Sequence, residues 1–351
     1  VSIFRAKYIY TILGGFLAES ASDFMQAIVM IAALVAVLVI GTSAAGGLNA
    51  VIENAKSIPG FFELFGISTP VVADGVQQVG NGAPLFGERQ NFDLISIASL
   101  LAWGLGYFGM PQVLLRFMAI RHERELGYSR RIATVWCAIA LFAAVFIGLI
   151  GRDLFPAALT TASESENVFI RLSTSLFPSF LAGLVMAGIL AATISSSDSY
   201  LLISASAFAK NIYQGIFKKD TPEKKVMWVS RITLMVIAVI AAVIALDENS
   251  VIFKLVSFAW SGFGATFGPL MIFSLFWKRI NRTGAIAGMI SGGSMVFIWK
   301  FLISPLGGVF GIYELLPAFM VSCIFIIVVS LCTEKPSEEL CADFDAVKAG
   351  K

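Results

Sequence analysis

The sequence predicts an all-α membrane protein. Of its 351 residues, 58% are hydrophobic and only 14% are charged, and the mean hydropathy is +0.85. Soluble domains of this size do not combine so many apolar residues with so few charges. The apolar residues also gather in runs of about 20 or more, the length that a helix needs to cross a bilayer. Basic residues gather between these runs.

Eight apolar runs predict about eight transmembrane helices. They cover residues 18–42, 93–119, 130–151, 177–208, 226–246, 251–277, 283–303 and 312–332.

The loops between these runs differ in their content of lysine and arginine. Residues 121–131 hold four arginines, residues 210–225 hold five lysines, and residues 278–282 hold three further basic side chains. The alternate loops at 247–250 and 304–311 hold none. Because short basic loops remain in the cytoplasm, this pattern predicts that both ends of the chain are cytoplasmic.

The domain organisation follows from the same pattern. Residues 1–332 are predicted to form one transmembrane domain, and residues 333–351 a polar cytoplasmic tail. Residues 43–92 are rich in Gly, Pro and Asn, which predicts an extracytoplasmic loop with a short interfacial helix near 59–66. The chain begins at Val1 and not at Met, and we expect it to be a fragment of a longer protein.

One carboxylate lies inside the apolar run 177–208. Asp198 is the only charge in that run, and a charge at membrane depth costs several kcal/mol. At helical spacing Ser195, Asp198 and Ser199 share a face, with Ala192 beside it. The hydroxyls around Asp198 are Thr193, Ser195, Ser196, Ser197 and Ser199. Such an oxygen-rich patch suits a small hard cation. The alternative is that these hydroxyls only bond to backbone carbonyls or to a neighbouring helix.

A second carboxylate, Asp23, lies close to the start of the predicted span 18–42. It is either part of a functional site or an interfacial carboxylate stabilised by a helix N-terminus.

An aromatic motif with irregular backbone follows in the span 93–119. Trp103 and Tyr107 are one helical turn apart, and Pro111 lies one turn further on. Pro111 removes an internal hydrogen bond, and three glycines lie between Trp103 and Pro111. Irregular backbone at membrane depth persists only where it packs on protein or lines a cavity. The motif therefore predicts either a wall for a small amphipathic substrate or a kinked helix with a packing aromatic pair.

Small residues recur in the span 251–277. Gly262, Ala265 and Gly268 are three residues apart, which is typical of closely packed membrane helices. We expect this segment to act in packing rather than in direct contact with a substrate.

These segments, in this order, resemble the sodium/solute symporter family, and most closely its bacterial sodium/proline symporters. The likeness covers nearly the whole chain. The segments that carry it are residues 10–18, 103–109, 116–119, 188–199 and 259–265, with weaker echoes at 284–289 and 299–300.

The resemblance implies a LeuT-type core of two inverted five-helix repeats. The run 18–42 would be the last helix of the first repeat. The next five runs would form the second repeat, and the last two would be additional helices. The N-terminal helices of the family, including the broken first core helix, would be absent from this chain. In this fold the main sodium site lies between that broken helix and the serine-bearing one.

The resemblance also implies which residues bind cations. The main sodium site would use the Ala192 carbonyl with the hydroxyls of Ser195 and Ser196. A second cation site would use Asp23 with Ser195 and Ser199. Asp198 stands where several relatives have a hydroxyl, so its part in cation binding and the number of ions stay open.

Trp103, Tyr107 and Pro111 match the substrate site of proline transporters. Met110 and Gln112 differ from the pattern of that site. The implied function is sodium-coupled symport of a small amino acid, with L-proline as the first candidate, by alternating access in the bacterial cytoplasmic (inner) membrane. Sodium would be the coupling ion, the lipid bilayer the surroundings, and no nucleic-acid partner is expected.

Three alternatives remain. The solute could be pantothenate, another amino acid or a monocarboxylate. The chain could also be a transporter-like sensor module of a signalling protein. An enzyme is not expected, because the single histidine, His122, lies in a charged loop and no metal-ligand or nucleophile constellation accompanies it.

Overall fold

The computed structural model describes residues 2–246 and 251–348 of the chain. Within these ranges it describes the side chains of all residues except 2–22, 194–196, 198 and 199.

The described chain is mostly helical, which confirms the predicted all-α membrane class. Six helices are long and apolar enough to cross a bilayer, and a bent pair adds a seventh. The six are Asp23–Ala44, Glu125–Leu154, Glu223–Ile244, Ile252–Phe276, Arg282–Leu306 and Leu315–Cys332. The predicted span 177–208 corresponds to the helix Ser179–Ser206, and its crossing of the bilayer stays a prediction.

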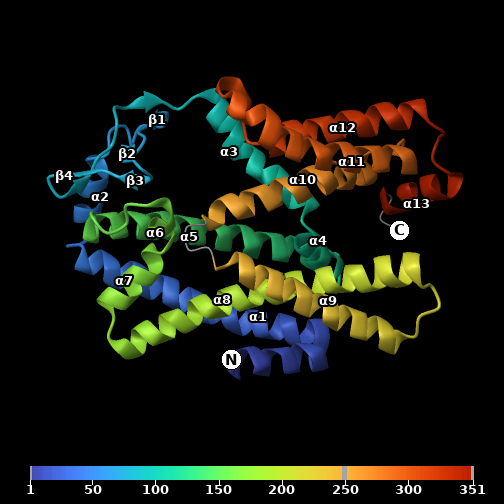
Figure 1. The fold of residues 1–351 in the computed structure, drawn as a ribbon, viewed down its shortest axis with the longest axis horizontal. Coiled ribbons are helices and arrows are strands. Elements are labelled where there is room, and N and C mark those ends of the chain that lie inside the picture. Colours follow the sequence, from blue (N-terminus) through green and yellow to red (C-terminus); the bar gives the residue numbers. More distant parts are fainter. Residues whose placement is uncertain (1, 247–250, 349–351) are drawn as a thin grey trace. The chain divides into compact units, whose positions relative to one another are not determined.

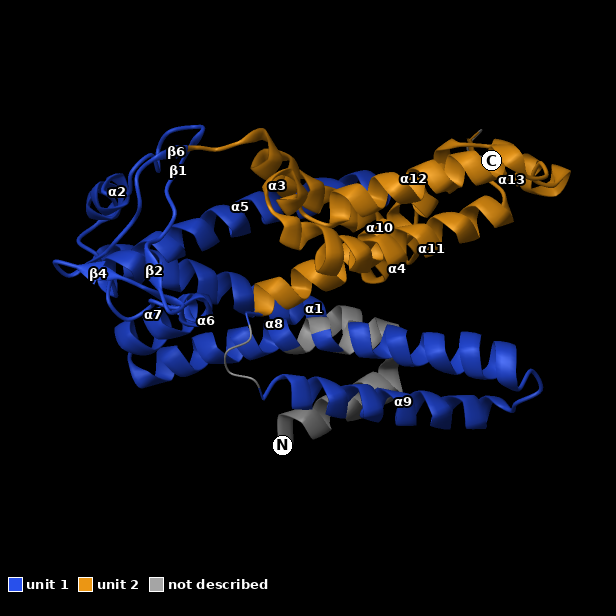
Figure 2. Ribbon diagram, turned by 45° about the horizontal axis from the view of Figure 1, so that its top comes forward, with its two compact units in different colours: residues 1–90, 124–251 blue, residues 91–123, 252–351 orange. Residues whose placement is uncertain are grey.

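The contacts within the chain define two compact units, coloured separately in Figure 2. Unit 1 comprises Val1–Gln90 and Arg124–Val251, and unit 2 comprises Asn91–Glu123 and Ile252–Lys351. Each unit is described by itself below.

Long helices dominate unit 1 (Figure 1). They are α1 (Ser2–Ala44), α2 (Leu48–Lys56), α5 (Glu125–Leu154), α6 (Ala162–Glu166), α7 (Val168–Leu176), α8 (Ser179–Ser206), the π-helix η2 (Ala207–Phe217) and α9 (Glu223–Ile244). Side chains from several of these helices form its core, namely Ala33, Val37, Val51, Ile147, Ile150, Leu172, Phe177 and Val185.

The contact between α1 and α8 depends on a glycine. The two helices lie side by side and run in opposite directions (Figure 1). A Cβ atom added at Gly188 of α8 would lie 3.3 Å from Ala33 Cβ and 3.5 Å from Val29 Cγ1 of α1. A methyl group there would be tightly packed and a larger side chain would push the helices apart, so the small residue suits this close approach.

The segment that links α1 to the next span differs from its prediction. Its helix is α2, at residues 48–56, whereas residues 59–66 form turns and the start of a strand, so the predicted helix at 59–66 is wrong. Pro59, Gly60 and Gly66 favour turns over helix. The rest of the segment forms strands of two residues each: β1 (Gly66–Ile67), β2 (Val72–Ala73), β3 (Val76–Gln77), β4 (Val79–Gly80), β5 (Ala83–Pro84) and β6 (Gln90–Asn91).

Two tight hairpins order this segment. β2 pairs with β3 across Asp74 and Gly75, and β4 pairs with β5 across Asn81 and Gly82. All four turn residues have positive φ angles. Asp-Gly and Asn-Gly are the pairs that two-residue hairpin turns of this kind favour.

Unit 2 contains a broken helix and the C-terminal helices (Figure 1). Its elements are α3 (Leu94–Gly106), the 3₁₀ turn η1 (Tyr107–Gly109), α4 (Pro111–Met118), α10 (Ile252–Phe276), α11 (Arg282–Ile298), the π-helix η3 (Trp299–Ile303), the turns η4 (Ser304–Leu306) and η5 (Gly308–Gly311), α12 (Leu315–Cys332) and α13 (Glu338–Lys348). Its core is formed by Ala265, Val296, Leu315, Ala318 and Phe319.

A stripe of glycines brings α11 against its neighbours. Gly284, Gly288 and Gly292 are four residues apart and buried. A Cβ atom at Gly292 would lie 2.9 Å from Ser322 Cβ of α12. The Ser322 hydroxyl also donates a hydrogen bond of 2.9 Å to the Gly288 carbonyl. Small residues at this spacing are how membrane helices pack closely.

The polar tail carries a helix, α13, which packs near the loop between α10 and α11. Lys278 forms an ion pair with Asp345 of α13, and Arg279 donates a hydrogen bond of 2.9 Å to the Thr333 carbonyl. The cytoplasmic location of this tail stays a prediction.

The glycine contact between α1 and α8 gives a first prediction. We expect Gly188→Val to force α1 and α8 apart and to cost about 1–3 kcal/mol of stability, as overpacking does. Gly183→Val on the same helix is the control, because no atom lies within 4 Å of its added Cβ. Thermal unfolding in detergent measures both variants. Equal melting temperatures for the two would contradict the packing described here.

Candidate functional site

The predicted break in the aromatic motif is present. α3 ends at Gly106, η1 continues to Gly109, and α4 begins at Pro111 with its axis bent by 50°. Met110 between them is extended, with φ −81° and ψ 115°. Because Pro111 has no N–H, the Tyr107 carbonyl receives no helical hydrogen bond from that residue. The break therefore places irregular backbone, including a carbonyl without its α-helical hydrogen bond, next to the aromatic residues.

The indole of Trp103 lies among aromatic rings from α10 and from the start of α12. Its ring is nearly parallel to those of Phe253 (centroids 5.5 Å apart, 7°), Trp260 (5.4 Å, 13°) and Tyr313 (6.0 Å, 17°). Offset parallel stacking of this kind is favourable beyond the area that it buries. The protein itself therefore covers much of the Trp103 ring.

Trp260 joins this cluster to the broken helix. Its indole Nε1–H donates a hydrogen bond of 3.0 Å to the Trp103 carbonyl. Its ring also meets that of Tyr107 edge to face, with centroids 4.8 Å apart. A single side chain of α10 thus fixes both the backbone and a ring of the motif.

Glycines allow this close approach. A Cβ atom at Gly106 would overlap the Trp260 indole, and one at Gly109 would overlap the Phe263 carbonyl of α10. On the opposite side, a Cβ atom at Gly264 would lie 2.7 Å from the Gly106 Cα. Gly106 and Gly109 therefore do more than weaken the helix of the motif, because they also allow its backbone to lie against α10.

The small residues predicted to pack in α10 behave differently from one another. Ala265 and Gly268 are buried against neighbouring helices, as predicted. Among the described residues no atom lies within 4 Å of a Cβ atom added at Gly262, so its part in packing stays a prediction. Gly264 takes that role because it faces the broken helix.

The two other predicted substrate residues are accessible to different degrees. Tyr107 is 48% exposed, whereas Pro111 is half-buried at the first position of α4. The Tyr107 ring is thus held in place by Trp260 but remains exposed, whereas other aromatic rings cover much of the Trp103 ring.

The predicted cation residues lie on α8 and α1 of unit 1. α1 and α8 are in contact at Val29 and Gly188. At a rise of 1.5 Å per residue, Asp23 lies about 9 Å from this contact along α1, and residues 195–199 lie about 10–16 Å from it along α8. Because the helices run in opposite directions, Asp23 and residues 195–199 lie on the same side of this contact. The backbone at Asp23 therefore lies at a similar height along the helix pair as the backbone of residues 195–199. Ala192 is half-buried one turn beyond Gly188.

The side chains of Ser195, Ser196, Asp198 and Ser199 lie outside the described residues. Two neighbouring hydroxyls are described. Thr193 donates to the Ile189 carbonyl at 3.0 Å, and Ser197 donates to the Thr193 carbonyl at 2.7 Å. These two hydroxyls bond back to their own helix, which is the alternative stated for the cluster.

Asp23 requires a correction. The sequence offered a helix N-terminus as one explanation for this carboxylate. Because α1 begins at Ser2, Asp23 lies well inside the helix, and that explanation is wrong. The most apolar part of the helix starts near Asp23, but the helix itself extends back through residues 2–22, in which charged and hydroxyl side chains interrupt the apolar ones.

The predicted substrate residues belong to unit 2 and the predicted cation residues to unit 1. Sequence reasoning assigned residues 258–269 to packing and gave no role to Phe253 or Tyr313. An aromatic residue in α10 can be seen in the sequence, but its pairing with Trp103 is a tertiary contact that spacing does not reveal.

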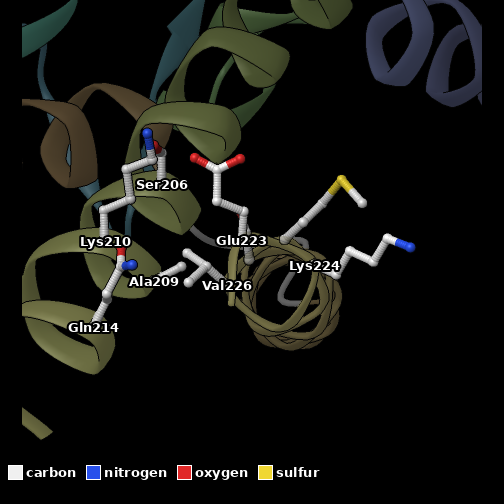
Figure 3. Close-up of a pocket in the computed structure, with 9 residues that line it drawn as sticks. Ser206, Ala209, Lys210, Gln214, Glu223, Lys224 and Val226 are labelled. Carbon is white, nitrogen blue, oxygen red and sulfur yellow. The ribbon is translucent and has the colours of Figure 1, made fainter. Parts of the chain in front are cut away.

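A cavity of about 440 Å³ lies elsewhere in unit 1, between η2 and α9 (Figure 3). Lys210 and Gln214 lie on one wall and Glu223 on the other. None of the predicted site residues is among its described lining residues.

The fold defines a multi-pass helical membrane protein with one broken helix. The sequence profile described as "Sodium:solute symporter family" matches residues 1–292. The chain therefore belongs to the sodium:solute symporter family, as its motifs indicated.

Individual relatives agree with this assignment. The chain is 39% identical to a sodium/proline symporter of Haemophilus influenzae over 99% of its own length and 66% of the relative's. It is 38% identical to the osmoregulated proline transporter OpuE of Bacillus subtilis over 94% of its length, and 34% identical to the high-affinity proline transporter PutP of the same species over 96%. It spans 62% and 65% of those two proteins.

The close contact at Gly106 gives a second prediction. We expect Gly106→Ala to displace the Trp260 indole and to lower the melting temperature in detergent. Gly104→Ala is the matched control, because no atom lies within 4 Å of its added Cβ. In a helix, alanine in place of glycine is stabilising by about 0.5–1 kcal/mol. The two changes should therefore have opposite signs, and a stabilising Gly106→Ala would contradict the contact.

Proposed function

We propose that the protein containing this chain is a sodium-coupled symporter of a small amino acid, with L-proline as the first candidate. The observation that carries the proposal is the broken helix of unit 2, with the exposed ring of Tyr107 beside its irregular backbone. Family membership and relatives named as proline transporters support it.

The proposed architecture is the LeuT-type core. In it, α1 is the last helix of the first repeat, the broken helix α3–α4 opens the second repeat, and α11 and α12 are additional. This arrangement gives eight spans, with both ends of the chain in the cytoplasm and the protein in the bacterial cytoplasmic membrane. The basic loops support that orientation.

Substrate binding follows from the chemistry of the break. A carbonyl oxygen has two lone pairs, so the Tyr107 carbonyl, which receives no bond from Pro111, can accept a hydrogen bond from the ammonium group of an amino acid. The exposed face of the Tyr107 ring can contact the apolar part of the substrate. Trp103, largely covered by protein rings, supports this wall more than it forms its surface.

Sodium binding is assigned to α8. The Ala192 carbonyl and the hydroxyls of Ser195 and Ser196 form the main site, and Asp23 with Ser195 and Ser199 form the second. Asp23 and residues 195–199 lie at a similar height on two packed helices, and this supports the pairing. Sodium binding then favours the outward-open state, substrate docks, and one helix bundle rocks against the other.

The proposal is tested by sodium-dependent uptake of L-proline into proteoliposomes that contain the complete protein. We expect Ser195→Ala to raise the sodium concentration for half-maximal uptake by about tenfold, equivalent to about 1.4 kcal/mol. Ser197→Ala is the control, since its hydroxyl bonds to its own helix. An unchanged sodium requirement in Ser195→Ala would remove this residue from the site. A competition panel with pantothenate and monocarboxylates tests the choice of proline.

Asp198 provides a separate prediction. With Asp23 nearby, two carboxylates can share one cation or one proton. We therefore expect Asp198→Ser to change the dependence of the sodium requirement on pH. Uptake measured over a matrix of sodium concentrations and pH values checks this. Identical pH and sodium profiles for Asp198→Ser and the parent would leave Asp198 without a special role.

A further inference from the structure

A buried carboxylate lies next to the aromatic cluster and takes no part in the function proposed above. Glu314 immediately precedes α12 and is only 4% exposed. Its Oε1 atom lies 3.5 Å from Lys300 Nζ and 3.5 Å from the oxygen of the Ser261 hydroxyl, which donates its shorter hydrogen bond of 2.8 Å to the Phe258 carbonyl. Its position at the start of a helix also favours a negative charge. Residues of η3, α10 and α12 therefore meet at one carboxylate.

The neighbouring residue, Tyr313, connects this carboxylate to the proposed substrate wall. Its hydroxyl donates a hydrogen bond of 2.6 Å to the Ser257 carbonyl of α10. Its backbone N–H donates one of 3.0 Å to the Ser99 hydroxyl of α3. Its ring lies nearly parallel to that of Trp103, 6.0 Å away. Tyr313 thus holds α3, α10 and the Trp103 ring at once.

The energetics indicate a purpose other than stability. A buried ion pair contributes little net stability, because desolvation offsets much of the attraction. Both contacts of Glu314 are also long for hydrogen bonds. What the carboxylate does is to bring Lys300 of η3 and Ser261 of α10 next to the start of α12, beside Tyr313.

We propose that Tyr313 and Glu314 are positioning residues for the substrate wall, with Glu314 fixing Tyr313 and Tyr313 setting the orientation of Trp103. This inference rests on the proposed function, because it assigns the broken helix to substrate binding. Both residues lie beyond residues 1–292, the part of the chain that matches the family profile. A helix outside the two repeats would then tune the affinity of the site within them.

Uptake kinetics give the first test in the complete protein. Tyr313→Phe keeps the ring and removes only its hydrogen bond to Ser257. We expect it to raise the KM for L-proline about three- to tenfold, as the loss of one hydrogen bond does, with a nearly unchanged maximal rate. Glu314→Ala should act in the same direction. The double variant should be no worse than the stronger single variant, because both changes act through Tyr313.

Ser322→Ala is the structural control on the same helix. It removes a buried hydrogen bond from α12 to Gly288 at a distance from the aromatic cluster. We expect a lower melting temperature and an unchanged KM. If Tyr313→Phe and Glu314→Ala behave like Ser322→Ala, or if their effects on KM simply add, the positioning role is overturned. Glu314→Gln replaces the alanine variant if the latter does not fold.

A second readout does not depend on the substrate. This chain contains six tryptophans. Labelling the complete protein with 5-fluorotryptophan allows ¹⁹F NMR, with the Trp103 signal identified by Trp103→Phe. We expect Tyr313→Phe and Glu314→Ala to shift this signal and Ser322→Ala to leave it in place. An unmoved signal in both variants overturns the inference. Absence of proline uptake in the parent would instead refute the proposed function, while the NMR comparison would still decide the positioning role.

Discussion

The close approach of α10 to the broken helix α3–α4 is the contact on which the structure of unit 2 depends. It is possible because Gly106, Gly109 and Gly264 carry no side chains where the two backbones meet. In a membrane, where lipid is as apolar as the protein interior, such packing takes the place of the hydrophobic effect in holding helices together. Gly109 and Met110, next to the bend, are buried in protein, and burial in protein is a condition under which irregular backbone persists at membrane depth.

This contact also sets the chemistry of the candidate substrate site. The Trp260 indole can reach the Trp103 carbonyl only because Gly106 leaves room for it. The same indole meets the edge of Tyr107, which therefore presents a fixed ring and an exposed surface. Trp103 in turn is covered by Phe253, Trp260 and Tyr313. The residue of the motif with the largest ring is thus a support, and the smaller ring of Tyr107 is the proposed contact surface.

Much of the fold could be predicted from the sequence, because long apolar runs and a proline within one of them determine helices and a break locally. The hairpins at Asp74-Gly75 and Asn81-Gly82 are equally local features, but residues 43–92 were predicted as a loop with a helix at 59–66. Two features could not be predicted in this way. The helix through Asp23 starts in a mixed segment, residues 2–22, that hydropathy alone does not mark as part of the span. The contacts of Trp260 and Tyr313 with Trp103 join residues far apart in the chain. The assignment of cations to Ser195, Ser196 and Ser199 stays a prediction.

The central claim is that α10 holds the broken helix in place and leaves Tyr107 to contact the substrate. A cryo-EM structure of the complete protein with sodium and L-proline bound tests it most directly. The account predicts a break between Gly109 and Pro111, the Trp260 indole hydrogen-bonded to the Trp103 carbonyl, and proline against the Tyr107 ring. A continuous helix through residues 103–118, or proline stacked on a Trp103 ring that α10 does not contact, would contradict it.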